Sequence, residues 1–168
     1  MRGFLSGKIS SRRSSSIVTR LNEQLGPIQI SLVEFLRDQI IEKNDLFNNL
    51  LENEEILKMK ELQECNGLES SLRYRAGRIA AKSALQCLGM KPSSAILHDT
   101  HGAPIFPSFI SGSISHKNNL ALSGVIRTND STTTTVMIGV DIEQLGGGSE
   151  RLGQRILTGS LHRMIIHL

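Results

Sequence analysis

Two carboxylates near the end of the sequence, Asp141 and Glu143, are the residues with the clearest potential for chemistry. The apolar residues that alternate with them predict a β-strand over 136–142, in which successive side chains point to opposite faces. The two carboxylates would then emerge on one face, about 7 Å apart along the backbone. Such a pair suits Mg²⁺, which prefers oxygen ligands. Two interpretations stay open: a magnesium site, or a strand that simply ends at an acidic surface.

A second candidate is the stretch 112–117, which reads Gly-Ser-Ile-Ser-His-Lys. Small residues let backbone amides approach a ligand, and a hydroxyl, an imidazole and an ammonium can together hold a phosphate. We expect a turn here, directly before a strand. The alternative is an ordinary surface turn without a ligand.

Basic side chains recur at helical spacing in a third stretch. Arg75, Arg78 and Lys82 are three and four residues apart. They lie in the segment 72–88, whose apolar residues keep one helical face and which Gly89 ends. The cations would therefore stack along one side of a helix, either as a solvated face or as a phosphate-binding face. Combined with the first two stretches, the second option describes a site for a polyphosphate ligand with Mg²⁺.

Two helices are expected ahead of that basic helix. Ser31 and Glu34 have the spacing of a capping box, in which the two side chains satisfy the first free amides of a helix. This predicts that a helix begins near Leu32. A second helical run is expected to continue through Met59, and the acids of this region would form the solvated faces of both helices.

Short strands are expected after Ile96, where extended pieces alternate with turns. The segments 120–126 and 136–142 read as strands, and the polar residues 127–135 between them predict a hairpin with a long loop. A short amphipathic segment at 151–168 ends the sequence.

Charge is distributed unevenly along the 168 residues, whose net charge is +3. Residues 1–20 carry +5, residues 21–69 carry −7 and residues 70–168 carry +5. Nucleic-acid binding has little support, because the basic leader has no interleaved aromatic residues and an acidic segment follows it. Cys65 and Cys87 lack the spacing of a zinc site or a disulfide scaffold, which favours a reduced intracellular compartment.

The location within the cell has two interpretations. No apolar run approaches the roughly 20 residues of a membrane span, so we expect none. Residues 1–20 are rich in Ser and Arg and lack acids, a pattern that resembles a mitochondrial or plastid transit peptide. The alternative is a disordered basic start on a cytoplasmic protein.

Four ordered stretches resemble the 4′-phosphopantetheinyl transferases of the enterobactin synthase component D type. They are RAGRIAAKSAL at 75–85, GAPIFP at 102–107, SGSISH at 111–116 and GVDIE at 139–143. The resemblance covers residues 70–158. It implies an α+β fold, the first lobe of a two-lobe enzyme, with helices packed on a small antiparallel sheet.

The resemblance also implies an activity. Enzymes of this family transfer the 4′-phosphopantetheine arm of coenzyme A to a serine of an acyl, peptidyl or aryl carrier protein, with Mg²⁺, in siderophore, polyketide or fatty acid biosynthesis. Asp141 and Glu143 would be metal ligands. Ser115 and His116 would contact the 3′-phosphate of coenzyme A. The full set implied for coenzyme A is Arg75, Arg78, Pro104, Ser115 and His116.

Composition, charge and the resemblance together divide the chain into four parts. These are a basic extension (1–25), an acidic helical segment (26–69), the first-lobe core (70–158) and a truncated tail (159–168).

A second-lobe motif of the family is absent: a Lys-Glu pair, followed by another Lys, that supplies a third metal ligand and a candidate base. No catalytic residue is therefore assigned, and impaired transfer is expected. The alternative is a non-catalytic remnant that binds coenzyme A or a carrier protein. A homo-oligomer formed through the exposed lobe face is a further expectation.

Overall fold

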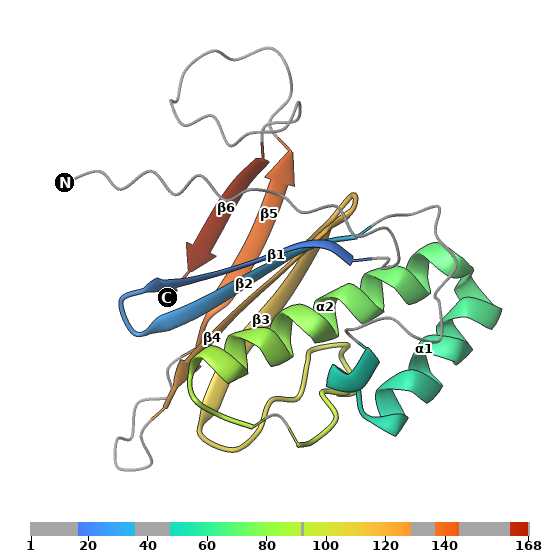
Figure 1. Cartoon of the computed structure of the whole chain (residues 1–168), viewed down its shortest axis with the longest axis horizontal. Coiled ribbons are helices and arrows are strands. Elements are labelled where there is room, and N and C mark those ends of the chain that lie inside the picture. The colour runs from blue at the N-terminus through green and yellow to red at the C-terminus, as the bar shows by residue number, and fades with distance from the viewer. Residues whose placement is uncertain (1–16, 36–47, 92, 129–136, 145–161, 168) are drawn as a thin grey trace.

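An antiparallel sheet with two helices forms the centre of the molecule, and a second pair of strands lies behind it (Figure 1). The computed structural model describes residues 17–35, 48–91, 93–128, 137–144 and 162–167. The strands are β1 (Ile17–Leu25), β2 (Ile28–Phe35), β3 (Ile110–Lys117), β4 (Leu120–Arg127), β5 (Gly139–Gln144) and β6 (His162–His167). The helices are the 3-10 turn η1 (Asn48–Leu50), α1 (Asn53–Asn66) and α2 (Leu68–Cys87). This confirms the expected α+β class.

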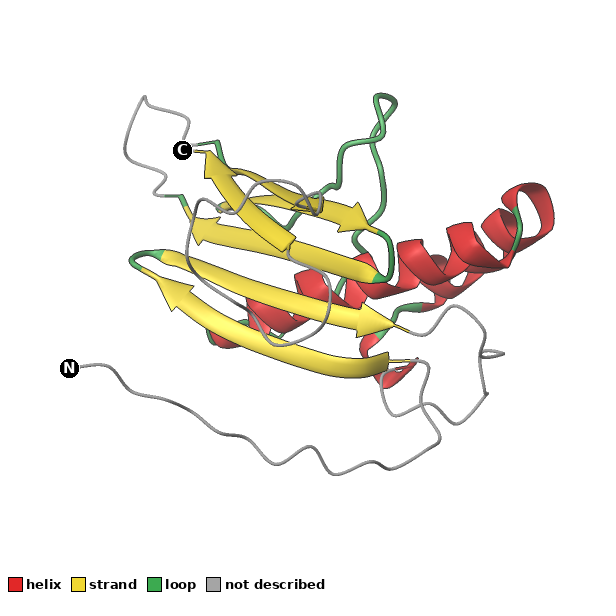
Figure 2. Cartoon of the chain, turned by 90° about the horizontal axis from the view of Figure 1, so that it is seen from above, coloured by secondary structure: helices red, strands yellow, loops and turns green. Residues whose placement is uncertain are grey.

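In the four-stranded sheet, whose order is β1-β2-β4-β3, both faces of the central strands β2 and β4 are buried. Val33 and Phe35 of β2 pack under α2, in a cluster that also includes Met59 of α1. Both helices therefore lie on the same side of the sheet (Figure 2). Ile30 points the other way and packs with Val140 of β5. The sheet thus separates a helix side from a β5 side.

Helix α2 is the central element, because nearly all of it is buried between the sheet, α1 and the chain after it. It confirms the helix expected at 72–88 and begins four residues earlier, at Leu68. Gly67 has a φ of 84°, which glycine adopts at low cost, so that α1 ends and α2 begins without an intervening loop. Neither α1 nor α2, the described α-helices, has the length and apolar character needed to cross a membrane.

The helix expected from Leu32 is wrong, because residues 28–35 form β2. Ser31 caps no helix; it is fully buried and lies opposite Ser123 of β4. A strand that is buried on both faces reads as a continuous apolar run, which periodicity cannot distinguish from a helix. A capping box forms instead at the start of α1, where the Glu52 amide donates to Oε2 of Glu55 over 2.8 Å.

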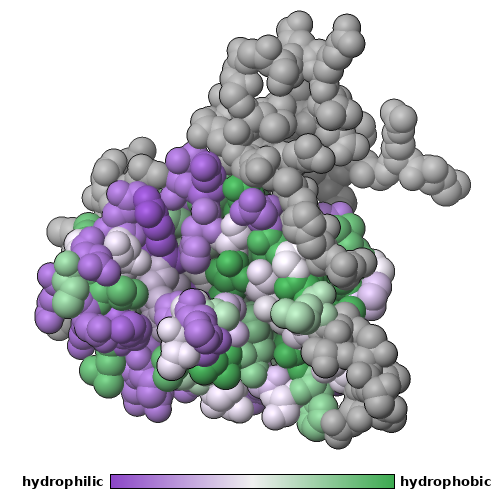
Figure 3. Space-filling model, turned by 180° about the vertical axis from the view of Figure 1, so that it is seen from behind, coloured by the Kyte–Doolittle hydropathy of each residue, from purple (hydrophilic) through white to green (hydrophobic). Residues whose placement is uncertain are grey.

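The second helical run, through Met59, is confirmed by α1. Its exposed polar and charged side chains, acids among them, give the hydrophilic region on the α1 side in Figure 3. Glu55 is the exception to the expected solvated face, because its side chain is completely buried.

The expected hairpin between 120–126 and 136–142 is also wrong. Strand β4 pairs with β2 and β3, whereas β5 pairs with β6 and packs across the other face of the sheet. The hairpin partner of β4 is β3, through a turn at Asn118, whose φ is 54°. The stretch 112–117 is therefore part of a strand and not the expected turn.

The expected N-terminal extension is only partly described. Residues 1–16 lie outside the described residues, and residues 17–25 form β1. At the other end, the boundary expected at 158 and most of the segment 151–168 lie outside them too, except for β6.

Candidate functional site

Strand β3 presents the two neighbours Ser115 and His116 to opposite sides of the sheet. Ser115 faces β5, where its Oγ donates to Oδ1 of Asp141 over 2.8 Å. His116 faces α2, because a Cβ on Gly77 would lie 2.5 Å from its Nε2. Successive residues of a strand alternate in this way. The structure therefore separates two residues that the sequence resemblance assigned to one phosphate.

The carboxylate part of the site is on the β5 side. Asp141 is exposed, while its neighbours Val140 and Ile142 are buried against the sheet, as the alternating pattern predicted. Oδ1 of Asp141 also accepts a hydrogen bond from the Ile142 amide over 2.9 Å. Glu143 is two residues further along the same strand, and only its backbone is described.

The oxygen ligands available on β5 fit Mg²⁺. This cation is commonly held by one or two carboxylates, with water and substrate phosphate completing its coordination. The exposed Asp141 carboxylate, held in place by Ser115, meets that description. Among the side chains that the structure describes, no three potential metal ligands come together. A magnesium site here would therefore depend on Asp141, Glu143 and the substrate.

On the helix side, His116 lies at the end of β3 with one edge of its ring against α2. Glycine at position 77 makes this contact possible, since a Cβ there would also lie 3.0 Å from Cγ2 of Ile114. Burial of this edge, together with the charges of Arg78 and Arg73, lowers the pKa of His116 to about 4. A hydrogen bond with the Arg73 backbone acts in the opposite direction. His116 is therefore neutral near pH 7.

Arg78 is the centre of a cluster of aromatic and basic side chains. Its guanidinium lies 4.4 Å from the ring centroid of Tyr74, a cation–π arrangement. Its Nη2 is 2.8 Å from Nε2 of His98, whose ring also contacts Tyr74. Because a guanidinium only donates, Nε2 of His98 must accept, so the imidazole is neutral with its proton on Nδ1. Partial burial and the charge of Arg78 lower the pKa of His98 accordingly.

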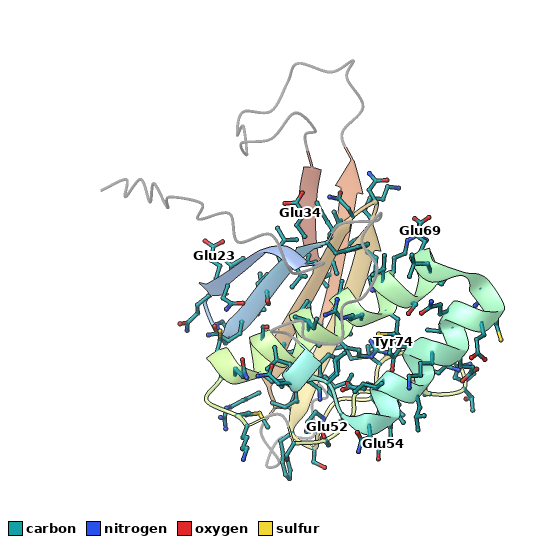
Figure 4. The ribbon with its side chains drawn as sticks, turned by 45° about the vertical axis from the view of Figure 1, so that its right-hand side comes forward. Glu23, Glu34, Glu52, Glu54, Glu69 and Tyr74 are labelled. Carbon is teal, nitrogen blue, oxygen red and sulfur yellow. The ribbon has the colours of Figure 1, made fainter. Side chains whose placement is uncertain are left out.

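Tyr74 holds this cluster together from α2 (Figure 4). It belongs to the core under the helices, and its burial raises the pKa of its phenol. Its rigid ring contacts both the guanidinium of Arg78 and the ring of His98, which also contact each other.

The structure corrects the interpretation of the basic helix face as a solvated face. Arg75, Arg78 and Lys82 are each at most 2% exposed, so they do not form a solvated face. Lys82 binds no external phosphate either, because its Nζ forms a buried ion pair with Oε2 of Glu55 at 2.8 Å. Of the three, Arg78 reaches the candidate site, through its contact with His98.

A tight turn precedes Pro104, which the resemblance assigned to coenzyme A binding. His98 and Pro104 form an isolated β-bridge, and the Asp99 carboxylate accepts hydrogen bonds from the amides of His101 and Ala103, each over 2.8 Å. Gly102 adopts the positive φ that this tight turn requires. Pro104 itself is half-buried, and its backbone forms the β-bridge that closes the turn.

Sequence reasoning missed two side chains whose charges act on His116, those of Arg73 and His98. Arg73 is partly exposed and pairs with Glu69 one turn earlier, while its charge acts on His116. It could have been found from its position one helical turn before Gly77, the residue that admits the His116 ring. His98 carried no signal of its own, because its place depends on how the 96–105 segment folds back on α2.

We expect the stability of the protein to depend on the protonation of His116. The unfolded chain takes up the proton near the ordinary pKa of 6.5, whereas the folded chain does so only at about 4. The stabilisation that neutral His116 contributes is thus complete above about pH 6.5 and is lost as the pH falls toward 4.

Melting temperatures between pH 4 and 8 test this dependence. His116→Gln should flatten the wild-type decline below pH 6.5, while the two proteins run parallel above pH 7. An NMR titration of the His116 ring with a midpoint near 6.5 would contradict the assignment.

The comparisons with known proteins agree with this geometry. Residues 72–126 match the family model described as the 4′-phosphopantetheinyl transferase N-terminal domain. No curated protein matches the chain. The matched range contains most of α2, the turn with Pro104, and strands β3 and β4, but it ends before Asp141 and Glu143. The helices on an antiparallel sheet are the architecture expected for the N-terminal lobe of this transferase family, so the fold and the match over residues 72–126 both support the 4′-phosphopantetheinyl transferase superfamily.

Proposed function

We propose that this chain binds coenzyme A at the end of β3 and takes part in the Mg²⁺-dependent transfer of its 4′-phosphopantetheine arm to a carrier-protein serine. The observation that carries the proposal is the arrangement around Ser115 and His116. These adjacent residues link a carboxylate side, with Asp141, to a cationic side, with Arg78. A pyrophosphate-bearing substrate with a further phosphate needs both kinds of partner.

The cationic side is suited to the 3′-phosphate of coenzyme A. Arg73, Arg78, His98 and His116 come from α2, β3 and the turn between them, and their charges act on one another. A dianionic phosphate would be attracted by the charges of the two arginines and would favour the protonated form of His116. We therefore infer that His116 takes up a proton when the phosphate binds.

The carboxylate side is suited to the pyrophosphate. Asp141 and Glu143 would hold Mg²⁺, which when bound would neutralise charge on the pyrophosphate. Ser115 has a positioning role, because its hydroxyl fixes the Asp141 carboxylate by a direct hydrogen bond. The serine oxygen of the carrier protein would form the new bond to phosphorus as the P–O bond of the pyrophosphate breaks. Adenosine 3′,5′-bisphosphate would leave, and the serine proton would pass to solvent.

A second function, binding of coenzyme A without transfer, is favoured by one observation. The cationic residues lie inside the matched range 72–126, whereas both carboxylates lie outside it. Measurable binding of coenzyme A together with no transfer to an apo carrier protein in the presence of Mg²⁺ would select this second function.

Binding of coenzyme A and of 3′-dephospho-coenzyme A tests the assignment of the phosphate side. By calorimetry we expect the full-length chain to bind the dephospho compound about tenfold more weakly, because it loses a charge-assisted contact. His116→Gln should weaken coenzyme A binding and remove most of the difference between the two compounds. Equal affinity of the wild-type chain for both would contradict a 3′-phosphate contact here.

A further inference from the structure

The buried carboxylate of Glu55, on α1, takes no part in the proposed function. Its side chain is completely buried, and so is that of its partner Lys82 on α2. Oε2 of Glu55 forms an ion pair with Nζ of Lys82 and accepts a hydrogen bond from the Glu52 amide, each at 2.8 Å. Oε1 accepts a hydrogen bond from the Ile96 amide over 2.9 Å. One carboxylate thus connects α1, α2 and the chain that follows α2.

Stability alone is a weak reason for such an arrangement. Removing two charges from water costs several kcal/mol, and well-packed apolar residues often replace a buried ion pair at no loss of stability. Both charged groups are nevertheless retained in the interior. Nζ of Lys82 has a second partner, Oε1 of Glu52, at 3.4 Å. What the ion pair supplies, and apolar side chains cannot, is a directional anchor for a backbone amide.

The anchored amide begins the segment that brings His98 to Arg78. Ile96 is fully buried, and two residues later His98 contacts the guanidinium of Arg78. Between them, Leu97 accepts a hydrogen bond from the amide of Ile105 over 2.9 Å, which closes the turn. The position of the Ile96 amide therefore determines where the His98 ring meets α2.

We infer that Glu55 is a positioning residue for the coenzyme A site: through Lys82 and the Ile96 amide, its carboxylate holds the turn 96–105 so that His98 meets Arg78. This inference rests on the proposed function for its ligand. The positioning role can also be tested in the ligand-free protein, because the contact of His98 with Arg78 exists without substrate.

The test compares Glu55→Gln with Glu54→Gln in the full-length chain. Both variants make the same chemical change on the same helix, but Glu54 is exposed and points away from α2 (Figure 4). The first readout is the ¹⁵N shift and titration of His98 in the absence of ligand. The groups whose charges act on His98 are Arg78, Lys58 and Asp99. In Glu55→Gln we expect the His98 midpoint to rise toward its ordinary value, as the ring leaves Arg78, while Glu54→Gln keeps the wild-type titration.

The second readout is the affinity for coenzyme A, which should fall about tenfold in Glu55→Gln and remain unchanged in Glu54→Gln. If Glu55→Gln does not fold, Glu55→Met combined with Lys82→Met takes its place, because it leaves neither charge unpaired and still removes the anchor.

A folded variant with wild-type His98 titration and wild-type affinity would overturn the inference. A wild-type chain that binds no coenzyme A would instead contradict the proposed function, and the His98 titration would still decide whether Glu55 positions the turn.

Discussion

Replacing Asp141 by asparagine is expected to reduce pantetheinyl transfer at least about 100-fold, because the change removes a charge at the proposed magnesium site. Asparagine keeps the size of the side chain and an oxygen that can accept from Ser115. Asp141 is exposed, so the melting temperature should stay close to that of the wild type. The measurement is incorporation of labelled coenzyme A into an apo carrier protein over a range of Mg²⁺ concentrations.

The matched control is Glu23→Gln, which removes an exposed carboxylate from β1 at a position far from β5 (Figure 4). It should transfer at the wild-type rate. Excess Mg²⁺ should not rescue Asp141→Asn fully, since the lost group is a ligand and not a screening charge. Wild-type transfer by Asp141→Asn would remove the carboxylate from the proposed mechanism.

The sequence predicted those elements whose pattern is local. Helix α2 has an apolar face and a terminating glycine, and β5 has alternation of buried and exposed residues, so both could be recognised directly. The position of Asp141 on the exposed face of β5 followed from the same alternation. Both are properties of a few neighbouring residues and need no knowledge of the rest of the chain.

Features that depend on distant segments could not be predicted. Strand β2 looked helical because one face packs on α2 and the other on β5, two elements far away in the sequence. Likewise, the opposite orientation of Ser115 and His116 required knowing that 112–117 pairs with β4 as a strand. With a turn at these residues, one phosphate for both side chains was a reasonable expectation.

The roles of the basic residues on α2 could not be predicted from the sequence either. Helical spacing places Arg78 and Lys82 on one side of α2, and the sequence alone predicts no more than this. Which of them meets substrate depends on what covers that side. Here α1 supplies Glu55 to Lys82, and the turn after α2 supplies His98 to Arg78. A cation that pairs with an internal carboxylate supports the structure, whereas the buried guanidinium of Arg78 lies directly behind the exposed His98 ring, and its charge acts on that ring.

This difference predicts that Lys82→Met lowers the melting temperature by about 10 °C, the largest stability effect that we expect from a single substitution here. Methionine fills the space of the lysine stem but leaves the Glu55 carboxylate buried without its cation, and breaking such a pair typically costs about 3–5 kcal/mol. Thermal unfolding followed by circular dichroism measures the change.

Lys58→Met is the control for the loss of a lysine charge. Its ion pair with Glu61 lies on the exposed surface of α1, where solvent screens it, so no measurable change is expected. Combining Glu55→Met with Lys82→Met should recover much of the stability that Lys82→Met loses, because the uncompensated carboxylate is gone. A double variant no more stable than Lys82→Met would mean that the lost packing of the lysine stem, and not the buried charge of Glu55, accounts for the effect.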